Sequence, residues 1–252
     1  MKSLVAAFFF CLAALPALAG ELTVLSDYWC PFSCLPGNQP GYVIEIAKAV
    51  FEPKGVTVRY EPIPWEQAIR RATVEKGVAL AGCAKAETPN LVFPKTAVGV
   101  SRPAFYVQSG SSWRYQGVES LEHVRLGVAF GYDYGEAVNR YIQERPEKVS
   151  VASSEEPVKE SLRNLSLGHV DAIVGDPNVV LMTAGSMGMI GRIQSAGEAH
   201  ASIPIYLGFS PAEKESLNMA ALFDEGMREL RSSGKLASIL AKYGLTDWTA
   251  GK

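Results

Sequence analysis

The chain has 252 residues, of which 48% are hydrophobic and 20% are charged, and its formal net charge is −2. This length allows one or two domains with a full hydrophobic core. A nearly balanced charge without a stripe of Lys and Arg argues against a nucleic-acid-binding surface. The composition therefore indicates an ordinary globular protein that binds no nucleic acid.

Residues 1–19 are typical of a secretory signal peptide. Lys2 precedes an apolar run, Pro16 interrupts that run, and Ala17-Leu18-Ala19 forms a small-x-small cleavage site. The run is too short for a membrane span, and Cys11 lies inside it, which does not resemble a lipidation cysteine. We therefore predict cleavage after Ala19 and export to the periplasm.

Export makes the remaining cysteines interpretable. Cys30 and Cys34 end the stretch CPFSC, and an oxidising compartment permits a disulfide between them, with two free thiols as the alternative. Cys83 is then left over, either as a reactive thiol or as a small buried residue. Since there is no second cysteine pair and the three histidines are scattered, no zinc site is predicted.

Hydrophobic periodicity predicts alternating strands and helices in the N-terminal third of the chain. Residues 22–29, 56–65 and 78–82 have the pattern of strands, while 41–55 and 65–77 have apolar positions at helical spacing. This order implies a parallel sheet with helices on its faces.

The same pattern starts again after an extended segment near residues 105–108. Strands are predicted in LGVAF, VSVAS and DAIVG, with helices between them, and a second extended segment near 204–209 precedes two C-terminal helices. We predict an α/β fold of two lobes crossed by two strands, with residues 20–107 and 207–252 in lobe 1 and residues 108–206 in lobe 2. The cleft between the lobes is the expected ligand site.

Six stretches follow one another at a characteristic spacing: DYWCPF, GYVIEIAKAV, VRYEPIPWEQAI, ALAGCAKAETPN, LGVAFGYDYGEAV, and the pair LSLGHVDAIVGDPNVV and LRSSGKLASILAKYG. Together they resemble the solute-binding protein family that serves polar amino acid ABC transporters, from about residue 21 to 248. The resemblance implies a type II periplasmic binding protein with a hinge of two crossing strands. It also implies a monomer without a cofactor that works with an ABC permease in the inner membrane.

The resemblance assigns roles to residues in the first loop and after a lobe 2 strand. Phe32 matches the family's aromatic cover over the ligand, with Tyr28 and Trp29 as neighbours, and Asp176 matches the aspartate that accepts the ligand's ammonium group. Packing in the core is the alternative for the aromatic residues. An N-cap or Asx-turn before Pro177 is the alternative for Asp176.

Other candidates come from the ends of strands and helices. The stretch GYDYG matches the lobe 2 loop whose amides face the ligand, so Tyr132 and Tyr134 could stack on it or donate hydrogen bonds. A plain strand–helix turn is the alternative. Trp65 stands at the mouth of a helix, where it either lines the cleft or packs the helix.

The stretch GCAKAETPNL departs from the family pattern. Relatives place an arginine here that grips the ligand's α-carboxylate through a bidentate fork, whereas this chain has Asn90 and Leu91. Lys85 or Arg102 could supply a positive charge instead. The other ligand-binding residues predicted at this wall are Gly82, Cys83, Ala84 and Glu87.

Three functions compete on this scaffold. We expect a binding protein, not an enzyme, that captures a small polar or amine-bearing solute, such as an amino acid or derivative, for an ABC transporter. A sensory or orphan binder that feeds a membrane receptor is the first alternative. The second is an enzyme similar to the exported cyclohexadienyl dehydratases, with Glu87, Lys85 or Asp176 as its acid or base.

Overall fold

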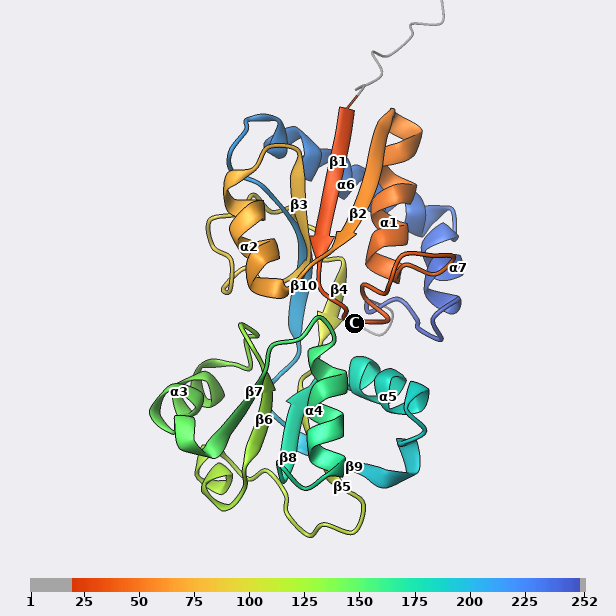
Figure 1. Ribbon diagram of the computed structural model, residues 1–252. Coiled ribbons are helices and arrows are strands. Elements are labelled where there is room, and N and C mark those ends of the chain that lie inside the picture. The colour runs from red at the N-terminus through yellow and green to blue at the C-terminus, as the bar shows by residue number, and fades with distance from the viewer. Residues whose placement is uncertain (1–19, 250–252) are drawn as a thin grey trace, which may run out of the picture.

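The computed structural model describes residues 20–249, which form two lobes joined by two extended connections (Figure 1). The predicted signal peptide, its cleavage site and Cys11 lie outside the described residues. Within them, no helix combines the length and the hydropathy that a membrane span requires.

Lobe 1 is built on a sheet with the strand order β2-β1-β3-β10-β4. β1 pairs in parallel with β2 and β3, while β10 runs antiparallel to β3 and β4. Its strands are β1 (Gly20–Ser26), β2 (Val56–Pro62), β3 (Val78–Cys83), β4 (Gly99–Ser101) and β10 (Ile203–Phe209). The helices around this sheet are α1 (Tyr42–Phe51), α2 (Trp65–Val74), α6 (Glu215–Ser232) and α7 (Lys235–Ala241).

Lobe 2 contains a second sheet with the order β7-β6-β8-β5-β9. Its strands are β5 (Ala104–Gln108), β6 (Leu126–Ala129), β7 (Val149–Ala152), β8 (Ala172–Gly175) and β9 (Ile193–Glu198). The helices of this lobe are α3 (Glu136–Glu144), α4 (Pro157–Ser166) and α5 (Pro177–Ser186). Short 3₁₀ helices are η1 (Glu52–Lys54), η2 (Val118–His123), η3 (Pro146–Lys148) and η4 (Ile190–Arg192). The predicted two-lobed α/β architecture is confirmed.

The chain crosses between the lobes at residues 102–103 and again at 199–202, because β4 and β10 belong to the first sheet and β5 and β9 to the second. The expected boundaries at 107/108 and 206/207 thus fall inside β5 and β10. The apolar runs in the sequence do not show where the chain passes from one sheet to the other. Pro103, which has no N–H to donate to a ladder, stands at the first crossing.

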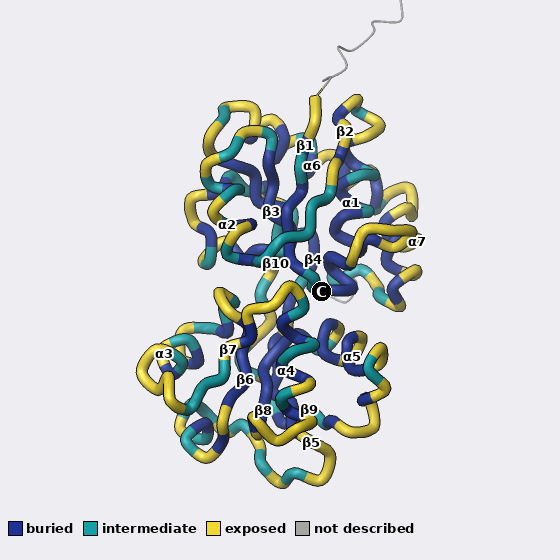
Figure 2. The backbone as a smooth tube through the Cα atoms, viewed as in Figure 1, coloured by how far each residue is buried: buried dark blue, intermediate teal, exposed yellow. Residues whose placement is uncertain are grey.

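Burial follows the periodicity of the sequence. The apolar face of α1 is buried against lobe 1, where its last residue, Phe51, packs beside Phe209 and Phe223. β3 lies between β1 and β10, and its run Val78–Ala81 is buried (Figure 2), as a strand covered on both faces requires. In lobe 2 the middle strand, β8, is buried along its whole length, so each sheet has a buried central strand.

The loop after β1 is closed by the predicted disulfide between Cys30 and Cys34. Backbone hydrogen bonds between Trp29 and Ser33 tighten it further. Phe32 is only 1% exposed beneath this loop, and its ring stacks on that of Trp29 with the centroids 3.9 Å apart. The loop thus holds Trp29 at the edge of the sheet that faces lobe 2.

Candidate functional site

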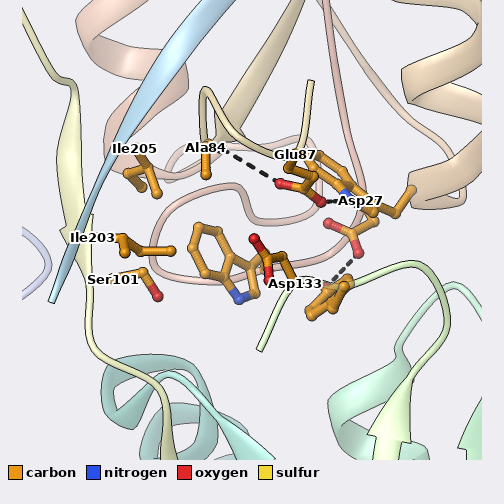
Figure 3. Close-up of a pocket in the computed structure, with 11 residues that line it drawn as sticks. Asp27, Ala84, Glu87, Ser101, Asp133, Ile203 and Ile205 are labelled. Atoms are coloured by element: carbon orange, nitrogen blue, oxygen red, sulfur yellow. Dashed lines mark hydrogen bonds between the residues drawn. The ribbon is translucent and has the colours of Figure 1, made fainter. Parts of the chain in front are cut away.

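A pocket between the lobes lies at the carboxyl ends of parallel strands in both sheets, and two neighbouring grooves are also lined by residues of both lobes. Loops that follow β1, β3 and β6 converge there, together with the start of α2 and the crossing strands β4 and β10. The residues that line the pocket are Asp27, Trp29, Trp65, Gly82, Ala84, Glu87, Ser101, Tyr132, Asp133, Ile203 and Ile205 (Figure 3). Ligand sites of α/β proteins occur at this edge of the sheet.

Aromatic rings form much of the pocket wall. Trp29 lies against the end of β3 at Gly82, which has φ +82°, and a Cβ added at Gly82 would come within 3.2 Å of the Trp29 ring. Glycine therefore serves both the backbone conformation and the close approach of the indole. Across the pocket, Trp65 of α2 meets Tyr132 of lobe 2 edge-to-face, with centroids 6.3 Å apart.

Glu87 is one of the acidic groups of the lobe 1 wall. Trp65 Nε1 donates a hydrogen bond of 2.7 Å to its Oε1, and the Ala84 N–H donates a longer one of 3.4 Å to Oε2. Burial outweighs these bonds and raises the pKa of Glu87 to about 7.

Asp27 and Asp133 bring two more carboxyl groups to the pocket, from lobe 1 and lobe 2. The Tyr132 hydroxyl donates to Asp27 Oδ2, and burial raises the pKa of Asp27 to about 6. Asp133 Oδ1 accepts from the Gly135 N–H and from Asn139 Nδ2 at the start of α3. In Figure 3, the two isoleucine side chains lie on the opposite side of the pocket from Asp27 and Glu87.

The two lobes touch at this site. The hydrogen bond from Tyr132 to Asp27 joins the loop after β6 to the loop after β1. Gly131 of lobe 2 also lies close to α2 of lobe 1. A Cβ added at Gly131 would lie 3.1 Å from Glu66 Cγ and 3.6 Å from Trp65 Cδ1. The lobes are therefore closed over the pocket.

Residues 22–246 match the profile of the bacterial extracellular solute-binding proteins, family 3. This match covers most of the chain. The chain belongs to this family.

Solved structures agree with the family fold. An ancestral arginine-binding protein bound to arginine aligns at TM-score 0.73 and 21% identity, covering 88% of this chain and 97% of its own. A histidine kinase sensor domain with similarity to periplasmic binding proteins aligns at TM-score 0.73 and 18% identity, covering 88% and 95%. An ancestral amino acid-binding protein, described as a precursor of cyclohexadienyl dehydratase, aligns at TM-score 0.68 and 18% identity, covering 88% and 94%. At these identities the likeness establishes the two-lobed fold of periplasmic binding proteins alone. No curated protein sequence matches the chain significantly.

The residues predicted from family patterns divide into those inside the pocket and those outside it. Trp29, Trp65, Gly82, Ala84, Glu87 and Tyr132 line it. Tyr28, Phe32, Cys83, Lys85, Arg102, Tyr134 and Asp176 do not. The structure thus brings six of the predicted residues together in this pocket and places the other seven outside it.

Three of the residues outside the pocket are packed in the cores. Phe32 lies beneath Trp29, and Cys83 is fully buried with its Sγ 3.6 Å from the Leu80 carbonyl. Burial raises the pKa of the Cys83 thiol to about 12, which keeps it protonated and unreactive. Tyr134 is 2% exposed, and its hydroxyl accepts from the Ala129 N–H at 2.7 Å.

The two basic candidates also lie elsewhere. Lys85 Nζ lies 4.3 Å from the centroid of the Tyr206 ring and 5.6 Å from that of Phe93. Arg102 borders a separate groove near Trp248. Tyr28 borders another groove beside Glu156. None of the residues lining the interlobe pocket is Lys, Arg or His.

Asp176 acts as the N-cap of α5. Its Oδ1 accepts from the Asn178 N–H, and its Oδ2 accepts from Ser101 Oγ and from the Arg102 N–H. Both oxygens are therefore committed to structure. They tie the N-terminus of α5 to the crossing between the lobes.

Family patterns also left out five lining residues: Asp27, Ser101, Asp133, Ile203 and Ile205. Asp27 and Asp133 each stand directly after a parallel strand or in its turn, which is a position that favours ligand contact. That position was the available sequence signal for these two. Ser101 and the two isoleucines come from crossing strands, whose approach to the pocket depends on the tertiary fold.

Proposed function

We propose that the protein captures a small polar or amine-bearing solute, such as an amino acid or derivative, and delivers it to an ABC transporter. The observation that carries this proposal is the interlobe pocket, whose acidic and aromatic groups come from both lobes. Family membership supports the same role, since the family comprises extracellular solute-binding proteins.

Ligand binding would act through the closure of the lobes. A solute that contacts Glu87 in lobe 1 and Asp133 in lobe 2 interacts with both only when the lobes approach each other. Such a ligand stabilises the closed conformation by its differential affinity for it. The permease would then distinguish the closed, loaded protein from the open, empty one.

Two features support a periplasmic location. The first 19 residues have the pattern of a cleavable signal peptide. The Cys30–Cys34 disulfide is a bond that persists in oxidising compartments such as the periplasm.

A thermal-shift screen of the purified mature protein tests the binding role. A library of amino acids, amines, short peptides, sugars and carboxylates should contain at least one compound that raises the melting temperature in proportion to the logarithm of its concentration. A strain that lacks the gene for this protein should then lose uptake of the radiolabelled compound. A library without any stabilising compound would refute the binding role, and unimpaired uptake would refute the transport role.

A sensory role is the second candidate, and the likeness to a histidine kinase sensor domain favours it. The two roles share the pocket and differ in the membrane partner. In the deletion strain, retained uptake together with a lost transcriptional response to the ligand would select the sensory role.

An enzymatic role has one supporting feature, which is the raised pKa of Glu87 in the pocket. The acidic lining opposes a substrate that carries carboxylates. Incubation with prephenate or arogenate should therefore yield no product, whereas product formation that Glu87→Gln abolishes would establish the enzyme.

A further inference from the structure

The interlobe pocket combines three carboxyl groups with three large aromatic rings. The carboxyl groups belong to Asp27, Glu87 and Asp133, and the rings to Trp29, Trp65 and Tyr132. No lining residue carries a positive charge. An occupant that complements this wall is positively charged and partly apolar.

We infer that the ligand is a small organic cation without a carboxylate, whose ammonium group binds between the Asp27, Glu87 and Asp133 carboxyl groups and against the tryptophan rings. This inference rests on the proposed function and names the ligand class of the same pocket. Ammonium groups are attracted to carboxylates and to the faces of indole rings, and a pocket that excludes water strengthens both interactions.

Asp27 places a buried carboxyl group at the pocket. The residue is 4% exposed, and Tyr132 of lobe 2 donates a hydrogen bond to its Oδ2. Figure 3 shows the carboxyl group of Asp27 at the pocket. A carboxylate can accept several hydrogen bonds, so it can accept one from an ammonium N–H as well as that from Tyr132.

A metal ion does not fit the same groups. Among the described residues, no three His, Cys, Asp or Glu side chains converge closely enough to coordinate a metal. The tryptophan rings of the pocket wall have no role in binding a hard cation, which prefers oxygen ligands. The arrangement suits a charge spread over an organic group.

An α-amino acid fits the pocket less well than the corresponding amine. Its carboxylate would lie among three acidic side chains without a neutralising group, because Lys85 rests over the Tyr206 ring and Arg102 borders a different groove. The corresponding amine has no carboxylate, so it avoids that repulsion and keeps the same ammonium contacts.

The available space sets the size of the ligand. The closed pocket leaves about 50 Å³ open to the centres of water molecules, and by that measure one water needs roughly 10–15 Å³. The closed form therefore holds the equivalent of roughly four waters. An ammonium group with a short carbon chain, such as ethanolamine, is of this size.

Cation binding should strengthen as the pH rises. Glu87 faces Trp65 of α2, the Ala84 N–H after β3, Asp27 after β1, and Asp133 in the loop after β6. In the empty pocket its pKa is about 7, and that of Asp27 is about 6. Since the cation binds the ionised carboxyl groups, its affinity should increase by about tenfold between pH 6 and 8 as Glu87 loses its proton.

Calorimetric titration of the mature protein with matched pairs tests the ligand class. The pairs are ethanolamine with serine, which fits the closed pocket in size, and two longer pairs, putrescine with ornithine and cadaverine with lysine, at pH 6 and pH 8. In at least one pair the amine should bind at least tenfold more tightly than its amino acid, and more tightly at pH 8. Asp27→Asn should weaken that amine by at least tenfold.

Glu136→Gln is the matched control, because it removes one carboxylate from an exposed position on α3, where Glu136 pairs with Arg140 and is 86% exposed. It should change amine affinity by less than twofold. If Asp27→Asn does not fold, as judged by its melting curve, Asp133→Asn probes the opposite wall with the same expected loss.

The outcomes separate this inference from the function on which it rests. Amino acids that bind as tightly as their amines, or a sugar or carboxylate that binds while every amine fails, would overturn the inference and leave a solute-binding protein. An amine whose affinity is unchanged in Asp27→Asn and Asp133→Asn would also overturn it. A protein that binds no compound of any class would overturn both.

Discussion

Glu87→Gln should make the protein more stable at alkaline pH. The glutamine is nearly isosteric, and its Oε1 can still accept the hydrogen bond from Trp65 Nε1 that Glu87 receives at 2.7 Å. The longer hydrogen bond, from the Ala84 N–H to Oε2 at 3.4 Å, can be lost, because the glutamine has an NH₂ group in place of that oxygen. The main effect of the change is to remove a partly buried carboxyl group that must ionise inside the pocket.

The magnitude follows from the pKa of Glu87, which rises from 4.5 to about 7 because of burial. Between these values the folded protein holds a proton that the unfolded chain has released. Its free energy of unfolding therefore falls as the pH rises from about 4.5 to 7 and is level above. At about 1.4 kcal/mol per pKa unit, ionisation of Glu87 costs up to about 3 kcal/mol of stability at pH 8.

Urea denaturation followed by tryptophan fluorescence measures this effect. The difference in unfolding free energy between Glu87→Gln and the unchanged protein should grow by about 2–3 kcal/mol between pH 5 and pH 8, in favour of the variant. Asp27 titrates in both proteins, so its contribution largely cancels. Glu136→Gln, a change at an exposed position of α3, should alter stability by less than about 0.5 kcal/mol at either pH. A difference for Glu87→Gln that is the same at pH 5 and pH 8 would refute the reasoning.

Two further substitutions test the closed state and the role of the α5 N-cap. Tyr132→Phe removes the hydrogen bond between the lobes at Asp27; ligand affinity should fall by about three- to tenfold, and small-angle scattering should give a larger radius of gyration for the ligand-free variant. Asp176→Ala leaves the donors of Ser101, Arg102 and Asn178 without their acceptor and should cost about 2–4 kcal/mol in urea denaturation. Asp176→Asn should be milder and should keep ligand affinity within about twofold, whereas abolished binding by a folded Asp176→Asn would place this residue in the ligand site.

The fold was predictable because its main elements leave local patterns. The apolar run Val78–Ala81 is long enough for a strand and too short for a helix, and it forms the buried centre of β3. The spacing of apolar residues over 43–51 matches one buried face of α1. The alternation of such patterns, twice along the chain, determines the two lobes.

The crossing points were harder to predict, since β5 up to Val107 and β10 are both apolar runs. Only pairing partners far along the chain decide which sheet each strand joins. Lys85 illustrates the same limit for a side chain. Its position over the ring of Tyr206 comes from the antiparallel pairing of β10 with β3, and nothing in the stretch AGCAKAETPN indicates that contact.

The sequence led us to expect Phe32 at the ligand, whereas Trp29 lines the pocket. The cause is local, and sequence patterns cannot resolve it. Both residues belong to the loop that the Cys30–Cys34 disulfide closes, and their rings are stacked. One ring of a stacked pair faces the core and the other faces outward. Because Phe32 packs toward Tyr42 of α1, with centroids 5.3 Å apart, Trp29 is the ring that reaches the pocket.

Hydrogen-bond partners identify the residues that have a structural role. Asp176 accepts three hydrogen bonds from the protein, and the Tyr134 hydroxyl is fixed by a backbone N–H. Asp27 is just as deeply buried, but it lines the interlobe pocket, where it accepts a hydrogen bond from Tyr132 of lobe 2. Buried polar groups are normally satisfied by partners, so the surroundings of each aspartate decide its role. The partners of Asp176 lie up to 75 positions away in the sequence, so its internal role becomes apparent only in the folded chain.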